Sequence, residues 1–368
     1  MRLRRLGFPD LPDWAPTEFI AAWPAYIDSC RALTNDLTPL RTGAPPTVGM
    51  AELARRAQHV APEPDAVSNF FLDNFEPFEV LSDAGTGEGF VTGYYEPELD
   101  GSERPDDEFS APVLARPDDL IDMRGSTARG WNRKFEGARR APDGRLSVYP
   151  TRSEIENGIL GEVAQPVVWL RDHVEVFFCQ VQGSARLRLK SGERRRLVYA
   201  GRNGRPYTSI GRLLIMQGEI APDDMSLARC KAWLRANGLE LGERGRAILQ
   251  SNESYVFFNL EPDSNPGHGP IGAQGVPLTP MRSIAVDRTI WPYCTPIWIG
   301  SDLSSAGLGR SITGRLVIAQ DTGSAIVGAA RGDLFIGSGD RAGEIAGLIR
   351  HAARFFVLLP KGHAQHAG

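Results

Sequence analysis

The pattern of hydrophobic and polar residues predicts helices near the N-terminus and short strands along most of the remaining chain. Between Thr17 and Leu33, hydrophobic residues recur every three or four positions, which is typical of an amphipathic helix despite Pro24. Shorter helical patterns follow at Met50 to His59 and at Pro64 to Asn74. Strands are expected at Glu79–Leu81, Gly89–Pro97, Val174–Gln182, Ala185–Leu189, Arg196–Tyr199, Tyr255–Phe258, Ser283–Val286, Pro296–Ile299, Leu316–Ala319 and Phe355–Leu359.

Glycine and proline separate these segments. Ser191–Gly192 reads as a hairpin turn, and helices at Ser209 to Gln217 and Ser226 to Ala236 are each followed closely by a glycine, as left-handed C-caps prefer. Many short strands joined by such turns favour a small closed barrel over an open sheet. The polar segment Gly101 to Asp107 is a candidate crossing between domains.

Composition agrees with a mainly β protein that contains some helix. The 368 residues suit two domains, and 42% hydrophobic residues with 40 Gly and 27 Pro indicate a loop-rich globular chain. No segment is apolar for long enough to cross a bilayer. The start, Met1 to Pro9, has the positive charge of a signal peptide without its apolar core. Either the protein is not exported, or this start does not represent the complete precursor.

Charge and cysteine spacing exclude several kinds of partner. A formal net charge of -4 argues against a general nucleic-acid binder. A local basic cluster is expected to be the exposed face of a hairpin, and an acidic polymer would be its natural ligand if it binds one; its members are Arg186, Arg188, Lys190, Arg194, Arg195 and Arg196. The spacing of histidines and cysteines indicates neither a metal site nor a disulfide framework, and no cofactor is expected. The cysteines read as buried small hydrophobes; they are Cys30, Cys179, Cys230 and Cys294.

Two aspartates lie among glycines beside apolar residues, which is how a chain places carboxyls in a groove. Asp333 precedes Leu334, Phe335 and Ile336, so burial would disfavour its ionised form. A carboxyl kept protonated is a general acid. On the residues alone, Asp333 is also compatible with a turn, and Asp321, in Asp-Thr-Gly, with a carboxylate that organises a turn by accepting backbone N–H groups.

Six motifs in order resemble the membrane-bound lytic murein transglycosylase A family over most of the chain beyond Val91. They are Gly93-Tyr-Tyr-Glu-Pro97, Gln180-Val-Gln-Gly-Ser184, Tyr199-Ala-Gly-Arg-Asn-Gly204 with Tyr207-Thr-Ser-Ile-Gly211, Ser254-Tyr-Val-Phe-Phe258, Val276-Pro-Leu-Thr279 with Ser283-Ile-Ala-Val-Asp287, and Ala319-Gln-Asp-Thr-Gly323. The resemblance implies a double-psi β-barrel interrupted by an inserted β-rich domain, with N-terminal helices. The barrel would comprise residues 1–104 and 249–368, and residues 105–248 would form the other wall of a glycan groove.

The resemblance also implies an activity: cleavage of the β-1,4 bond between N-acetylmuramic acid and N-acetylglucosamine in peptidoglycan, giving 1,6-anhydromuramyl ends. It places the catalytic acid and base on Asp333 and a second carboxylate on Asp321. Because the attacking oxygen is the sugar's own 6-hydroxyl, one aspartate can serve as acid and then as base. Amides, hydroxyls and rings suited to orienting a neutral sugar polymer are expected at Tyr94, Tyr95, Gln182, Gly183, Ser184, Tyr199, Asn203, Tyr207 and Ser209.

Three positions depart from the family pattern, since the family commonly has glycine at Ser324, Ala185 and Cys294. Glycine readily adopts positive φ, so the backbone is expected to differ there. Two alternatives stay open: a hydrolase that uses Asp333 as acid and Asp321 as base for water, and a glycan-binding protein without turnover. If peptidoglycan is the partner, the protein is expected in the periplasm of the cell envelope. This location is compatible with an association with the outer membrane and with other cell-wall enzymes as partners.

Overall fold

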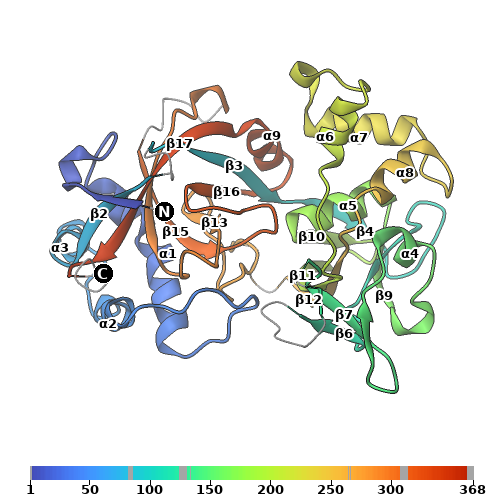
Figure 1. Ribbon diagram of the computed structural model, residues 1–368, viewed down its shortest axis with the longest axis horizontal. Helices are drawn as coiled ribbons and strands as arrows, with labels where there is room; N and C mark the ends of the chain where they lie inside the picture. The colour runs from blue at the N-terminus through green and yellow to red at the C-terminus, as the bar shows by residue number, and fades with distance from the viewer. Residues whose placement is uncertain are drawn as a thin grey trace. The chain divides into compact units, whose positions relative to one another are not determined.

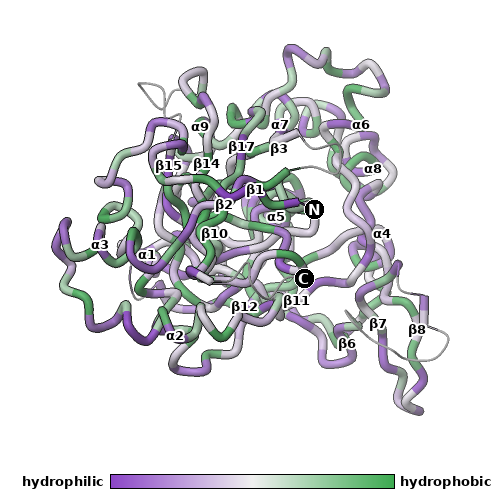
Figure 2. Tube along the Cα trace, turned by 60° about the vertical axis from the view of Figure 1, so that its left-hand side comes forward, coloured by the Kyte–Doolittle hydropathy of each residue, from purple (hydrophilic) through white to green (hydrophobic). Residues whose placement is uncertain are grey.

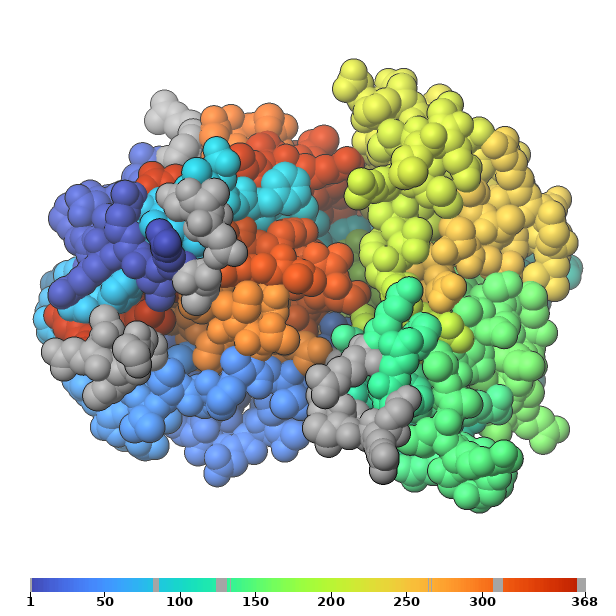
Figure 3. Space-filling view, viewed as in Figure 1, coloured from blue at the N-terminus to red at the C-terminus, as the bar shows by residue number. Residues whose placement is uncertain are grey.

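The computed structural model describes residues 2–81, 86–123, 131–132, 134–263, 265, 267–306 and 314–362. Contacts divide the chain into two compact units. Unit 1 comprises Met1–Tyr95 and Pro266–Gly368, and unit 2 comprises Glu96–Asn265. Figure 3 shows blue N-terminal and orange to red C-terminal atoms packed side by side in unit 1. The fold is mixed, with more strand than helix.

One sheet organises unit 1. Its strand order is β1-β2-β17-β14-β15-β13-β16-β3. The strands are β1 (Arg2–Arg5), β2 (Phe75–Leu81), β3 (Gly89–Glu96), β13 (Ser283–Val286), β14 (Pro296–Gly300), β15 (Arg315–Asp321), β16 (Arg331–Ser338) and β17 (Arg350–Pro360). The strands expected from the sequence in this unit are present, whereas β1 and β16 were not expected.

Strand β17 links β3, at one end of this strand order, back to the interior of the sheet. Its first residues pair with β3, from Arg350 opposite Thr92 to Ala353 opposite Gly89. Its later residues pair with β14 on one side and with β2 on the other. The pairing therefore runs from β17 through β14, β15, β13, β16 and β3 back to β17. This path brings β3 beside β16, which is the pair of strands that carries the candidate site.

The N-terminal helices pack against the sheet of unit 1, as Figure 1 shows. They are α1 (Thr17–Thr34), α2 (Val48–Ala57) and α3 (Pro64–Asn74), and α9 (Asp340–Leu348) packs on β16. The three predicted N-terminal helices are confirmed. Phe19 of α1 stacks on Phe71 of α3 with ring centroids 4.6 Å apart, and both join a core that includes Trp298. Green and purple segments alternate along α1 and α2 in Figure 2, as expected of helices with one buried face.

Unit 2 contains three smaller sheets with helices around them. The strand orders are β12-β11-β10-β4, β5-β9 and β6-β7-β8. The strands are β4 (Glu98–Gly101), β5 (Ala111–Leu114), β6 (Leu120–Asp122), β7 (Gly137–Arg140), β8 (Leu146–Val148), β9 (Pro166–Leu170), β10 (Ser184–Leu189), β11 (Arg194–Arg202) and β12 (Val256–Pro262). The helices are α4 (Arg152–Glu156), α5 (His173–Gln182), α6 (Ile210–Met216), α7 (Leu227–Ala236) and α8 (Arg244–Gln250). Short 3-10 turns lie at Gly161–Val163 and Pro222–Asp224 in unit 2, and at Phe8–Asp10 and Ser304–Ala306 in unit 1.

One predicted strand is wrong: the segment Val174–Gln182 is helix α5. The Asp172 side chain accepts a hydrogen bond from the Glu175 backbone N–H, which caps the N-terminus, and Gly183 ends the helix at φ 82°. Valine and phenylalanine favour strands, and this composition outweighed the capping signals in the sequence prediction. The helices at α6 and α7, and the turn at Ser191–Gly192, are confirmed.

The basic cluster of unit 2 is not simply an exposed hairpin face. Arg186 of β10 and Arg196 of β11 are register partners, and both form ion pairs with Glu96, whose side chain is fully buried. Arg188 pairs with Asp100, and Lys190 with Asp106. These four basic side chains therefore form ion pairs with carboxylates of the same chain.

Cys294 keeps the backbone conformation that a glycine would adopt, contrary to the expectation of a different geometry. Its φ is +72°, a left-handed conformation that non-glycine residues rarely adopt. All four cysteines are buried and unbridged, as small hydrophobic residues would be. Among the described residues, no helix is both long and apolar enough to span a membrane.

Candidate active site

Asp333 lies inside a strand rather than in a turn. It is the third residue of β16, and it stands opposite Ala285 of the neighbouring antiparallel strand β13. Alternate residues of a strand share a face, so Phe335 lies on the same side as Asp333, whereas Leu334 and Ile336 point to the other. Phe335 is fully buried and belongs to an apolar cluster with Tyr94, Leu278, Ala285 and Ile326. The apolar surroundings of the carboxyl thus come from several strands.

These surroundings change the acidity of Asp333. Burial raises its pKa from the usual value of 3.8 to about 6, and the nearby charge of Asp321 adds to the rise. A hydrogen bond from Thr92 and the positive charge of Arg331 act in the opposite direction. A carboxyl with this pKa is partly protonated near neutral pH and can therefore act as a general acid there.

Thr92 contacts this carboxyl and Arg331 contacts Thr92; sequence reasoning missed both residues. The Thr92 hydroxyl donates to Asp333 Oδ1 at 2.5 Å, and it accepts from Arg331 Nη2 at 2.8 Å. Burial lowers the pKa of the Arg331 guanidinium, whereas the charge of Asp333 raises it. Thr92 lies two residues before Tyr94, hence on the same face of β3. That spacing was the signal available in the sequence.

Asp321 is the last residue of β15 and is held by three donors. Oδ1 accepts from the backbone N–H groups of Ala273 at 2.9 Å and Thr322 at 2.8 Å. Oδ2 accepts from the hydroxyl of Tyr94 at 2.8 Å. In register, Ala285 of β13 stands between Asp321 on one side and Asp333 on the other. Two neighbouring strand pairs therefore bring both aspartates to one region of the sheet, and Asp321 organises the backbone there.

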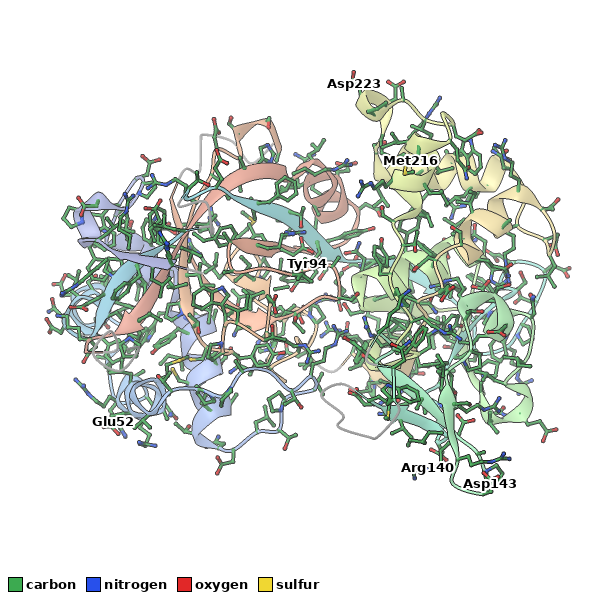
Figure 4. The ribbon with its side chains drawn as sticks, in the orientation of Figure 1. Glu52, Tyr94, Arg140, Asp143, Met216 and Asp223 are labelled. Atoms are coloured by element: carbon green, nitrogen blue, oxygen red, sulfur yellow. The ribbon has the colours of Figure 1, made fainter. Side chains whose placement is uncertain are left out.

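The two neighbouring tyrosines of β3 have different surroundings. Tyr94, labelled in Figure 4, is buried, and its ring centroid lies 5.4 Å from that of Phe335. Burial, followed by the negative charge of Asp321, raises the pKa of the Tyr94 hydroxyl well above its usual value. The Tyr95 ring packs against α9 so closely that a Cβ added at Gly343 would lie 2.7 Å from it. Tyr94 thus supports the aspartates, whereas Tyr95 packs against a helix.

The other residues that the sequence suggested for sugar binding lie in unit 2. Gln182, Gly183 and Ser184 form the junction between α5 and β10, with Gly183 as the left-handed C-cap. Tyr199 is in β11. Tyr207 precedes α6 and is exposed.

Two of these candidates have structural partners that account for their side chains. Asn203 is fully buried and donates to the carbonyls of Pro150 and Glu253, and its Oδ1 accepts from the N–H of Tyr255. Ser209 caps α6 by accepting from the Arg212 N–H. Their roles in substrate binding stay predictions. Across the described ranges, no group of three or more His, Cys, Asp or Glu side chains is arranged to hold a metal ion.

Comparison with known proteins defines the class of protein. Residues 90–259 match the family model described as the MltA specific insert domain, and residues 282–359 match the 3D domain. The second match contains β13 to β17, including both candidate aspartates. The chain is thus a 3D-domain protein with an MltA insert.

Individual relatives of known name support the same class of protein. A membrane-bound lytic murein transglycosylase from Agrobacterium tumefaciens superposes with a TM-score of 0.87 at 34% identity, covering 99% of each chain. MltA from Neisseria gonorrhoeae has a TM-score of 0.73 at 30% identity, covering 98% of this chain and 91% of that one. Membrane-bound lytic murein transglycosylase A of Vibrio cholerae is 32% identical over 279 residues, 74% of this chain and 66% of that protein. The match spans slightly less than two thirds of this curated relative. The chain belongs to the membrane-bound lytic murein transglycosylase A family.

Proposed function

We propose that this protein is a lytic transglycosylase that cleaves the β-1,4 bond between N-acetylmuramic acid and N-acetylglucosamine in peptidoglycan. The products would carry 1,6-anhydromuramyl ends. The observation that carries the proposal is Asp333, a carboxyl in the matched 3D domain whose pKa is raised to about 6 by burial. The names of the relatives, lytic murein transglycosylases, point to the same substrate class.

The raised pKa bears directly on the chemistry. An unperturbed aspartate would be protonated about 0.1% of the time at pH 7, whereas a pKa of ~6 gives about 10%. Protonated Asp333 would donate to the leaving glycosidic oxygen as the bond to the anomeric carbon breaks. The 6-hydroxyl of the same muramyl sugar would then attack that carbon and give its proton to the Asp333 carboxylate. No water is consumed, and the acid returns to its starting form.

The surroundings of Asp333 suit a group that must exist in both forms. Thr92 donates to Oδ1 and thereby stabilises the carboxylate, while the apolar cluster around Phe335 favours the protonated acid. Arg331 holds the Thr92 hydroxyl with its proton directed at Asp333. Neither residue needs to touch the sugar to act in this way, so we assign both as positioning residues.

The hydrolase alternative is less well supported because Asp321 is already engaged. A general base for water needs an accessible lone pair, and three of the about four lone-pair sites of the Asp321 carboxylate already accept hydrogen bonds from the chain. We therefore assign Asp321 to organising the backbone and to the electrostatics of Asp333. A negative charge near the site would also favour oxocarbenium character in the sugar.

We further propose that the sheet of unit 1 is a double-psi β-barrel, as in the family that the chain resembles. The pairing of β17 with β3 as well as with β14 supports a closed sheet. Residues 105–248 would be the inserted domain, contributing glycan-binding side chains such as Gln182, Ser184 and Tyr199. A periplasmic location follows from the substrate, and the relatives named membrane-bound belong to the cell envelope.

The test is mass spectrometry of purified peptidoglycan incubated, without added metal, with the wild-type chain or with Asp333→Asn. We expect anhydromuramyl products from the wild type and a loss of about 10²–10⁴-fold in the variant, the usual contribution of a general acid. The variant should fold normally, since Thr92 can donate to the amide oxygen. Asp340→Asn, an exposed aspartate at the start of α9, is the matched control and should retain activity.

Each outcome separates the proposals. Reducing-end products in place of anhydro ends would establish hydrolysis, and near-normal turnover by Asp333→Asn would overturn the assignment of the acid. Intact glycan that the wild-type chain nevertheless pulls down would establish a binding protein.

A further inference from the structure

Two cysteines that the proposed reaction does not use lie in contact within unit 1. Cys30 is in α1, and Cys294 precedes β14, so 264 positions separate them in the sequence. Their sulfur atoms are 3.8 Å apart, and both side chains are almost completely buried. Cys179 and Cys230 are also buried, in α5 and α7, without a mutual sulfur contact among the described residues.

A buried polar network fixes α1 next to the sheet at the level of Cys30. Ser29, the preceding residue, donates to Gln274 Oε1 at 2.8 Å, and its carbonyl accepts from Gln274 Nε2 at 3.1 Å. Gln320 of β15 donates to the Ala25 carbonyl at 2.8 Å and to Ser29 Oγ at 2.9 Å. These bonds set the depth and rotation of α1, and with them the position of the Cys30 sulfur.

The backbone of Cys294 is fixed equally firmly. Its N–H donates to the carbonyl of Ala319 in β15 at 2.8 Å. Its φ of +72° is a left-handed backbone conformation. A non-glycine residue in this conformation is strained, and such strain persists only where the surrounding structure determines it. The two sulfurs are therefore held together by backbone contacts that do not depend on any bond between them.

We propose that Cys30 and Cys294 form a disulfide when the chain folds in an oxidising compartment. This inference does not depend on the lytic activity. A disulfide bond is about 2.05 Å long, so the sulfurs need to approach by less than about 2 Å, a movement that side-chain rotation can supply. The bond would join α1 to the strand that follows Cys294.

The reaction is thiol–disulfide exchange with an external disulfide, such as a dithiol–disulfide oxidoreductase or a small-molecule disulfide. The thiolate of one cysteine attacks the oxidant and displaces one of its thiols, giving a mixed disulfide. The second cysteine, as thiolate, attacks the cysteine sulfur of that mixed disulfide and releases the other thiol. The protein loses two protons and two electrons, and the oxidant takes up both and is reduced to two thiols.

Burial determines when this exchange takes place. In the folded chain burial raises the pKa of the Cys294 thiol well above its usual value, which suppresses the nucleophilic thiolate. Oxidation must therefore precede the docking of α1, and the completed bond is shielded from reductants. A chain folded with free thiols would in turn resist later oxidation.

The full chain should be produced once with export to the oxidising periplasm of a bacterial host and once in the reducing cytoplasm. Each sample is alkylated under denaturing conditions and analysed by peptide mass spectrometry. For the exported chain we expect a linked Cys30–Cys294 peptide lighter by two hydrogen atoms, with Cys179 and Cys230 alkylated. Alkylation of all four cysteines in the exported chain, or a different pairing, would overturn the proposal.

Thermal unfolding gives a second readout. The exported wild type should unfold several degrees lower when a strong thiol reductant is present during heating, because the crosslink restricts the unfolded chain. Cys30→Ala and Cys294→Gly, the latter compatible with positive φ, should each abolish this reductant dependence. Cys179→Ala and Cys230→Ala should retain it. If a variant does not fold, the linked peptide of the wild type still decides the matter.

Discussion

The hydroxyl of Thr92 donates a 2.5 Å hydrogen bond to Oδ1 of Asp333, although 241 positions separate the two residues in the sequence. Arg331 donates to the same hydroxyl oxygen, so the Thr92 proton is directed at the carboxyl. This bond favours the carboxylate, whereas burial favours the acid, and the resulting pKa is about 6. Asp333 is thereby able to give up and recover a proton near neutral pH.

Initial rates of anhydromuramyl release are expected to fall as the pH rises through about 6. The folded protein holds the Asp333 pKa at about 6, so the protonated acid is lost above that value. About half of the molecules carry the proton at pH 6, and about 1% at pH 8. The measurement is the rate at low substrate concentration between pH 5 and 8.5. A rate that is constant from pH 6 to pH 8 contradicts Asp333 as the acid.

Thr92→Val is expected to move this alkaline limb to higher pH by about one to two units, because a hydrogen bond to a charged group contributes about 1.5–3 kcal/mol. The variant removes the donor to the carboxylate with little change in shape. Thr92→Ser keeps the hydroxyl and serves as the control, which should restore the wild-type midpoint. If Thr92 had only a packing role, Thr92→Val would lower the rate at every pH and leave the midpoint in place.

Local periodicity and turn chemistry predicted much of the fold. The spacing of Phe19, Trp23, Tyr26 and Cys30 identified α1, and glycines identified the ends of α6 and α7. The same reasoning failed at α5, where strand-favouring side chains form a helix because Asp172 and Gly183 supply both caps. Local composition favours a strand there, whereas the capping residues favour a helix. The helix forms, and its buried side chains pack against strands of unit 2.

Only the site residues that lie close together in the sequence could be predicted. Asp321 and Asp333 stand out because apolar residues and glycines surround them in one segment. Thr92 could not be assigned to Asp333 beforehand, because that contact exists only through the pairing of β3 with β16. The same limit applies to Tyr94, whose sequence motif suggested contact with sugar, while its hydroxyl donates to Asp321.

Two substitutions at Asp321 should separate its structural role from its charge. Asp321→Asn keeps an oxygen for the N–H groups of Ala273 and Thr322, so stability should be nearly unchanged. Without the like charge, the Asp333 pKa should fall, and the alkaline limb should move to lower pH by less than about one unit. Asp321→Ala leaves three donors without their acceptor and should destabilise the fold by about 2–4 kcal/mol.

Chemical denaturation and pH–rate profiles of both variants check this prediction. Complete inactivation of Asp321→Asn with an unchanged fold would instead give Asp321 a direct part in the chemistry, as the hydrolase alternative requires.

Gly332→Ala is expected to destabilise unit 1 and to reduce activity, because β16 has no room for a side chain beside Asp333. A Cβ at this position would lie 2.4 Å from Cδ1 of Ile284 and 3.0 Å from the Phe355 ring, and both residues are buried. Such overpacking costs about 1–3 kcal/mol and would displace the strand that carries the acid. Chemical denaturation followed by tryptophan fluorescence, together with the rate of product release, measures both effects.

Gly211→Ala is the matched control for this substitution. Gly211 lies in α6, where the nearest atom to an added Cβ is Sδ of Met225 at 3.6 Å, an ordinary contact distance. Alanine is favoured over glycine inside a helix by about 1 kcal/mol, so this variant should be as stable as the wild type or more stable. Wild-type stability of Gly332→Ala would mean that β13 and β17 yield easily around β16, and the close packing that buries Asp333 would then not account for its raised pKa.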